Sequence, residues 1–159
     1  MRKNRTGECG ATMAEFAIIS AVFFMIIFGI IEFGRLFYTH SALTDAARRG
    51  ARYAVLHDRT ANDDECVKKV VVFGETHINP STCAATGPAL INGLTTLNVT
   101  VTRSTDYGTN LGIATVEIKD YTFNLSIPLA RRTLTMPKYV TTLTTESAGR
   151  IPADVVTAP

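Results

Sequence analysis

The chain has 159 residues, a length that suits one modest domain with an appendage. Its formal net charge of +2 is concentrated at the N-terminal tip, and the rest of the chain is formally neutral. The tip carries three basic residues and one acid, Arg2, Lys3, Arg5 and Glu8. Nucleic-acid binding needs a basic face on the folded domain, so this distribution argues against a nucleic-acid partner. A basic tip before an apolar run is instead typical of the cytoplasmic side of a membrane helix.

A long apolar segment follows the tip. Residues 16–31 carry no charge, and Glu15 and Glu32 bracket them. Because a spanning helix needs about 20 mostly apolar residues, the uncharged run alone is a little short. Residues 11–38 are long enough if their three charged side chains are tolerated, and we predict a transmembrane helix over this range.

Two other interpretations of the segment are less favoured. A cleaved secretory signal peptide has a shorter apolar region that ends in a small-x-small site, and no such site follows here. A buried core helix would not require the basic tip. Within the segment, Glu32 and Arg35 are three positions apart, and we predict that they pair on one helix face.

The helix is expected to continue beyond the membrane, because residues 41–57 favour a helix by composition. Asp45 lies three and four residues before Arg48 and Arg49, which supports a polar face. No proline interrupts residues 11–57, so we expect one rod of roughly 70 Å. Small and apolar side chains form a stripe along its second half: Leu43, Ala47, Gly50, Ala51 and Ala54.

The start of the apolar segment resembles that of type IV prepilins. Gly10 is followed by a glutamate at the fifth position after it, then by Phe16 and an apolar helix. The sequence from Gly10 to about Ala54 more closely resembles the TadE-like family of the tight-adherence (Tad) pilus system. Two runs within it, residues 28–38 and 42–54, carry most of the resemblance, and the remaining chain has only a compatible pattern.

The resemblance implies that a prepilin peptidase cuts between Gly10 and Ala11, which makes Glu15 the fifth residue of the mature chain. Glu15 is costly at membrane depth unless it is paired. The resemblance supplies a partner, the freed α-amino group of another subunit, and implies that Glu15 and Phe16 serve recognition and helix registry. The alternative is that Glu15 extends to the membrane interface. Unlike major type IV pilins, the chain has no proline near the middle of the helix.

A second, short helix is predicted after residue 60. Asn62 is a candidate N-cap with Glu65 three residues later, as in a capping box. The helix is expected to end at Gly74. Its apolar face comprises Val67, Val70 and Val71.

The cysteines fit this topology. Cys9 belongs to the leader, so cleavage leaves Cys66 and Cys83, which we predict to form a disulfide in an oxidising periplasm. His77 lies between them, but no fourth ligand and no Cys-x-x-Cys spacing accompany it, which disfavours a metal site. We predict no metal and no cofactor.

Alternating apolar and polar residues predict strands in the C-terminal half. The expected strands are residues 97–101, 114–118, 123–127 after a bulge near Asp120, and 139–146, with Arg131, Arg132 and Pro137 in a connection and a frayed tail from residue 151. We predict an α+β, pilin-like fold. In it, a three- or four-stranded antiparallel sheet packs on the second half of the long helix.

No catalytic motif accompanies these elements. The sequence has no nucleophile motif and no phosphate-binding glycine loop, and His40, His57 and His77 are isolated from one another. Asp63 and Asp64 stand at a helix start, where they suit the helix dipole. We therefore predict that the protein is not an enzyme.

Together with these features, the resemblance implies a minor pilin or pseudopilin-like subunit for Tad pilus assembly. Residues 1–10 form a cytoplasmic leader, residues 11–38 a single span of the bacterial inner membrane, and residues 39–159 a periplasmic domain. Expected partners are the prepilin peptidase, other pilin-like subunits, the inner-membrane assembly platform and the lipid bilayer. The alternative is a single-pass membrane protein whose extracytoplasmic binding domain is unrelated to pili.

Overall fold

A computed structural model describes residues 6–57, 63–74, 78–79, 82–85, 87–104, 112–127 and 130–144. In chain order the elements are α1 (Thr6–Leu56), α2 (Asp63–Phe73), the 3₁₀ turn η2 (Thr96–Asn98), β1 (Val99–Arg103), β2 (Ile113–Ile118), β3 (Thr122–Ile127), β4 (Ala130–Thr135) and β5 (Tyr139–Thr144). The fold is α+β, with a long N-terminal helix and antiparallel strands, as predicted.

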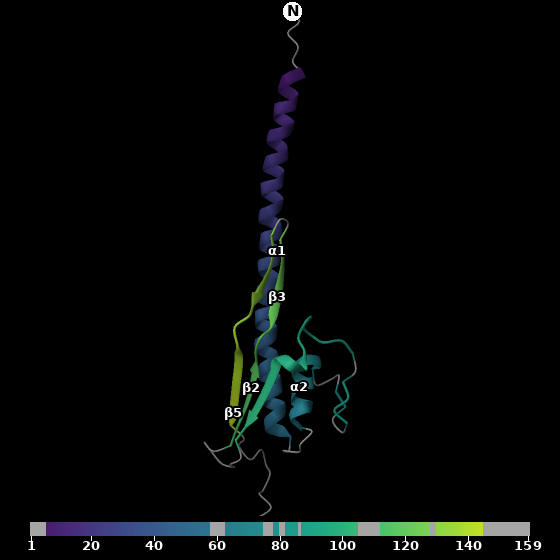
Figure 1. The fold of residues 1–159 in the computed structure, drawn as a ribbon, viewed down its shortest axis with the longest axis vertical. Coiled ribbons are helices and arrows are strands. Elements are labelled where there is room, and N and C mark those ends of the chain that lie inside the picture. The colour runs from purple at the N-terminus through teal and green to yellow at the C-terminus, as the bar shows by residue number, and fades with distance from the viewer. Residues whose placement is uncertain are drawn as a thin grey trace, which may run out of the picture. The chain divides into compact units, whose positions relative to one another are not determined.

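Helix α1 is continuous over 51 residues and is drawn as one uninterrupted coil in Figure 1. The absence of proline from residues 11–57 explains this continuity, because every backbone N–H in the interior can donate along the helix. The chain nevertheless divides into two compact units. One comprises Met1–Tyr38 and Phe123–Leu134, and the other comprises Thr39–Thr122 and Thr135–Pro159.

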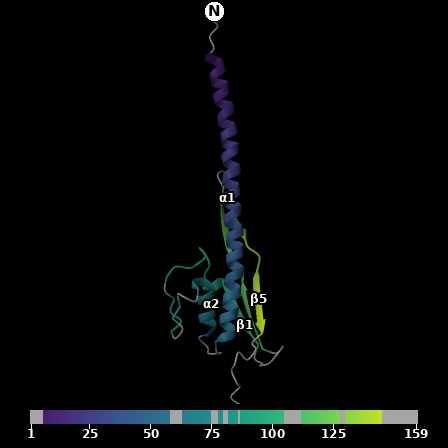
Figure 2. The same ribbon diagram turned by 180° about the vertical axis from the view of Figure 1, so that it is seen from behind.

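The second unit is built around the C-terminal part of α1. The predicted stripe of Leu43, Ala47, Gly50, Ala51 and Ala54 is buried, as the spacing indicated. Helix α2 lies beside this part of α1 in both views (Figures 1 and 2). A Cβ added at Gly50 would overlap the Val71 side chain and would lie 3.4 Å from Val116 Cγ1. Glycine is therefore what allows α2 and β2 to approach α1 so closely.

Helix α2 matches its prediction. Val67, Val70 and Val71 are fully buried. The helix ends before Gly74, which has φ +84°, a conformation that glycine adopts without strain. The predicted N-cap, Asn62, lies outside the described residues.

The second unit also holds a three-stranded antiparallel sheet in the order β1-β2-β5. Val99 pairs with Ile118 at one end of the β1–β2 ladder, and Ile118 pairs with Tyr139 in the β2–β5 ladder. Ala114, Val116 and Ile118 are buried, which confirms the predicted alternation along β2. The first strand begins later than predicted, because Leu97 lies in η2 and is 90% exposed.

Strands β3 and β4 differ from the prediction. They form a separate two-stranded sheet that belongs to the first unit, so Phe123 does not extend the main sheet. Asp120 precedes them with φ +55°, a left-handed conformation that ends the β2 ladder rather than forming a bulge within one sheet. Arg131 and Arg132, predicted to lie in a connection, are residues of β4. The predicted frayed tail lies outside the described residues.

Candidate processing and assembly site

The predicted processing residues lie in the first turns of α1. Gly10 and Ala11 are helical and exposed, and among the described residues no atom apart from the adjoining helix backbone lies within 4 Å of a Cβ placed on Gly10. Glu15 and Phe16 follow on the same helix, and Phe16 is 69% exposed. Ala11 and Glu15 are four positions apart, so they share one helix face, one turn from each other.

The surface of α1 after Glu15 is apolar and uncovered within the first unit. Among the described residues, α1 is the one helix long and apolar enough to cross a membrane, by length and composition. Its exposed large side chains include Ile18, Ile19, Phe23, Phe24, Ile26, Phe28, Ile30 and Ile31. A helix with this surface is consistent with a single-pass membrane protein.

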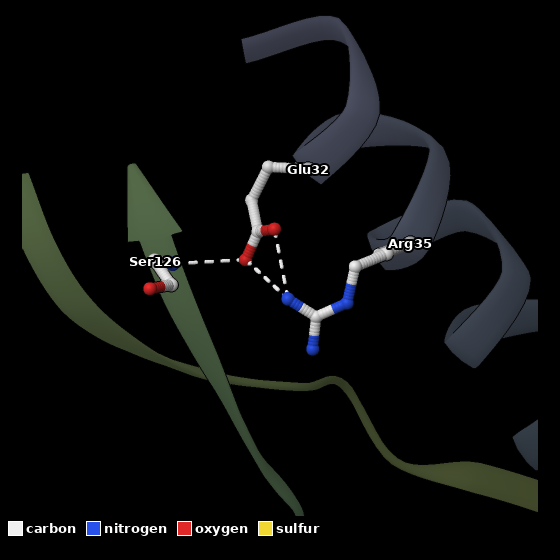
Figure 3. A network of polar contacts seen from close by, with 3 residues as sticks. All are labelled: Glu32, Arg35 and Ser126. Atoms are coloured by element: carbon white, nitrogen blue, oxygen red, sulfur yellow. Dashed lines mark hydrogen bonds and ion pairs between the residues drawn. The ribbon is translucent and has the colours of Figure 1, made fainter. Parts of the chain in front are cut away.

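Glu32 ends the uncharged run, and the first unit encloses it. The residue is 5% exposed, and its carboxylate pairs with the Arg35 guanidinium at 2.8 Å, as predicted (Figure 3). The backbone N–H of Ser126 in β3 donates to Glu32 Oε1 at 2.8 Å. The Arg35 guanidinium also lies 5.4 Å from the centre of the Phe123 ring. The hairpin β3–β4 is thus attached to α1 by a charge-assisted hydrogen bond and a cation–π contact.

The two glutamates that bracket the apolar run therefore differ in environment. Glu32 has its partners within the first unit. For Glu15, no hydrogen bond or ion pair of the side chain is present among the described residues, and the side chain is exposed. A carboxylate beside an apolar membrane segment needs a charged partner or water. Any partner of Glu15 must therefore come from outside the described residues.

The role of Ser126 was missed by sequence reasoning. The pairing of Glu32 with Arg35 follows from their spacing, but a main-chain donor 94 positions away leaves no residue pattern to detect. A weaker signal was present. Removing the charge of a glutamate from water directly after an uncharged apolar run costs more free energy than one exposed arginine offsets.

The thiols left after the predicted cleavage are joined. Cys66 in α2 and Cys83 form a disulfide with a Cα–Cα distance of 5.1 Å. Cys66 is almost fully buried beside the valines of α2. A β-bridge joins Ile78, which lies between the two cysteines, to Ala85, which lies two residues after Cys83. The disulfide thus joins Cys83 to the N-terminal part of α2.

The remaining candidate residues have structural contacts. His40 Nδ1 lies 2.7 Å from the Tyr139 hydroxyl, and the His57 ring stacks on Tyr53. Asp64 at the start of α2 forms an ion pair with Arg103 at 3.1 Å. Within the described residues no group of three or more His, Cys, Asp or Glu could hold a metal ion. His77 lies outside those residues.

Comparison with known proteins finds a match for the N-terminal segment. No curated protein and no solved structure matches the chain. Residues 10–52, however, match the family model described as TadE-like protein. The family is a structural one, associated with the Tad pilus, whose members carry an N-terminal apolar helix. The resemblance seen in this part of the chain is therefore confirmed over residues 10–52, which are similar to TadE-like proteins.

Proposed function

We propose that the protein is a minor pilin or pseudopilin-like subunit that enters Tad pilus assembly after a prepilin peptidase cuts between Gly10 and Ala11. The leader, residues 1–10, lies in the cytoplasm before cleavage. Residues from 39 onward lie outside the inner membrane. The exposed apolar surface of α1 first faces lipid and then faces the helices of neighbouring subunits.

The observation that carries this proposal is the difference between the two glutamates. A buried, fully partnered Glu32 is stable in an isolated subunit. An exposed Glu15 at the start of an apolar helix is costly in lipid, and a positive group on a neighbouring subunit offsets this free-energy cost. Cleavage after Gly10 creates such a group, the α-amino group of Ala11, one helical turn from Glu15 on each subunit. The TadE-like match at residues 10–52 covers all these positions and supports the same assignment.

Processing is tested by sequencing the N-terminus of the protein from cells with and without the prepilin peptidase. We expect Ala11 as the first residue in the first strain and an intact leader in the second. An unprocessed N-terminus in both strains would favour a single-pass membrane protein with an extracytoplasmic binding domain unrelated to pili.

Two glycine variants sharpen this experiment. Gly10→Leu introduces a large side chain at the proposed cut, where no described atom obstructs it. Gly29→Leu makes the same change farther along α1, where the space around the glycine is equally open. We expect Gly10→Leu to abolish cleavage and Gly29→Leu to leave it intact. Equal processing of both variants would contradict a cut at Gly10.

A further inference from the structure

The hairpin β3–β4 is attached to α1 at the end of its uncharged run. Ser126 of β3 donates its backbone N–H to Glu32 (Figure 3). The Phe123 ring packs against the Arg35 guanidinium. All of both strands except their outer residues, Thr122 and Thr135, belongs to the same compact unit as residues 6–38 of α1. Wherever Glu32 lies relative to the bilayer, the end of β3 that leads into the hairpin turn lies beside it.

A two-stranded sheet cannot lie in hydrocarbon. Among the described residues, β3 and β4 each have one strand partner, so each has one edge whose backbone groups are unpaired by a strand. Open sheet edges facing lipid do not occur in the hydrocarbon region, because each unsatisfied group costs several kcal/mol. The hydrocarbon must therefore end before Glu32. Residues 11–31 are about 20 residues and about 30 Å of helix, which suffices to cross it.

The hairpin is also basic. Residues 122–135 contain Arg131 and Arg132 and no acidic residue. Both arginines are exposed, and among the described residues neither side chain has a hydrogen bond or ion pair. Long arginine side chains can extend several ångströms from a strand to reach a charged surface.

The adjoining turn of α1 has the residues of a membrane interface. Phe33, Phe37 and Tyr38 are 58%, 61% and 76% exposed. The rings of Phe33 and Phe37 contact each other edge to face. Aromatic residues at this level are typical of the boundary between hydrocarbon and headgroups.

We propose that the β3–β4 hairpin lies on the membrane surface and binds anionic phospholipid headgroups through Arg131 and Arg132. The hydrocarbon boundary is then at Ile31 and Glu32 rather than at Tyr38. The hairpin covers the Glu32 carboxylate, which keeps that negative charge away from the headgroup phosphates. This inference rests on the membrane span in the proposed function.

The absence of tryptophan from the chain allows a direct test. Leu134 lies on β4 and is 40% exposed, so Leu134→Trp places a single fluorophore on the hairpin. The full chain is reconstituted in vesicles of phosphatidylcholine alone and of phosphatidylcholine with phosphatidylglycerol. Acrylamide is a neutral quencher that stays in water, so it reports how far the Leu134→Trp fluorophore is shielded from water. A second protein with Phe23→Trp, probed with lipids brominated near the chain ends, reports insertion of α1.

We expect the fluorophore of Leu134→Trp to be protected in anionic vesicles and to lose this protection in 1 M salt, where the Debye length is about 3 Å. Two arginines near an anionic surface shift the bound population by roughly 30-fold. Protection should be lost when Arg131→Gln and Arg132→Gln are combined. Arg48→Gln with Arg52→Gln removes the same charge from exposed positions of α1 in the other unit and should have no effect.

The outcomes separate this inference from the proposed function. Suppose that brominated lipids quench the Phe23→Trp protein, while acrylamide quenches the Leu134→Trp protein equally in both kinds of vesicle. That result would overturn the headgroup site and leave the span intact. Protection that persists in the double arginine variant would also overturn the site. If the Phe23→Trp fluorophore is not quenched from within the bilayer, the span itself fails, and the inference fails with it.

Discussion

Gly50 of α1 faces Val71 of α2 with no space for a side chain between them. A Cβ at position 50 would overlap Val71 Cγ2 and come within 3.4 Å of Val116 Cγ1. Val71 and Val116 are both fully buried, so neither can move into solvent. This contact sets how closely α2 and the sheet pack on α1 in the second unit.

Gly50→Ala should therefore destabilise the protein. Alanine raises helix propensity by up to about 1 kcal/mol, but overpacking a core typically costs about 1–3 kcal/mol. We expect a net loss of about 1 kcal/mol, seen as a lower Tm of the full chain in detergent. In a Val71→Ala background, which removes the obstructing methyl groups, Gly50→Ala should become neutral or stabilising. A similar loss in both backgrounds would show that packing is not the cause.

Glu15→Ala should leave membrane insertion intact and impair assembly with partner pilins. Removing the carboxylate makes α1 more apolar, so insertion is not weakened. The proposed pairing with a neighbouring α-amino group is lost. Membrane fractionation, partner co-purification and counting of pili measure the two effects separately. If co-purification and piliation are unchanged, Glu15 is better explained as extending to the membrane interface.

The Cys66–Cys83 disulfide should stabilise the second unit. The cysteines are 17 positions apart, and closing a loop of this size contributes about 3 kcal/mol in the chain-entropy account. Reduction, or Cys66→Ser with Cys83→Ser, should lower the Tm, and Cys9→Ser should not. Intact-mass analysis of the exported protein should find no free thiol at either position. Two free thiols would contradict the pairing.

Tyr139 should make stability sensitive to alkaline pH. Burial raises the pKa of Tyr139, and the nearby Tyr121 raises it further. The folded state thus favours the neutral phenol, whose pKa in the unfolded chain is about 10. This stabilisation is complete below the unfolded pKa and is lost as the pH rises through the folded pKa.

The measurement is the Tm of the wild type and of Tyr139→Phe from neutral to strongly alkaline pH. At neutral pH the variant should be less stable, because it lacks the hydrogen bond to His40. Above a pH of about 10 the difference should shrink. Tyr38→Phe, at a 76% exposed position, serves as the control and should follow the wild type. A constant difference between wild type and Tyr139→Phe across the range would exclude the role of Tyr139.

Local patterns predicted most of the helical structure. The spacing of Leu43, Ala47 and Ala54 identified the buried face of α1, and the three-residue spacing of Glu32 and Arg35 identified their ion pair. Both features depend on the spacing of residues along one helix, and this spacing can be read from the sequence. The candidate residues Gly10, Ala11, Glu15 and Phe16 were chosen from their order along the chain, and their roles stay a prediction.

Long-range pairing was predicted less well. Strand β4 was missed because its residues, including Arg131 and Leu134, are exposed on both faces and show no alternation. It forms because β3 is available as a partner, which periodicity does not reveal. The start of β1 was placed too early, since Leu97 continues the alternation of Val99 but has no partner on β2.

The bond from Ser126 to Glu32 uses the main chain of one residue and the side chain of the other. Position 126 can therefore accept almost any amino acid without losing the bond, except proline, which has no backbone N–H. Position 32 has no such latitude, because the acceptor is its own carboxylate. In a saturation library selected for a hairpin bound to α1, position 32 should be nearly invariant. Position 126 should accept every residue except proline.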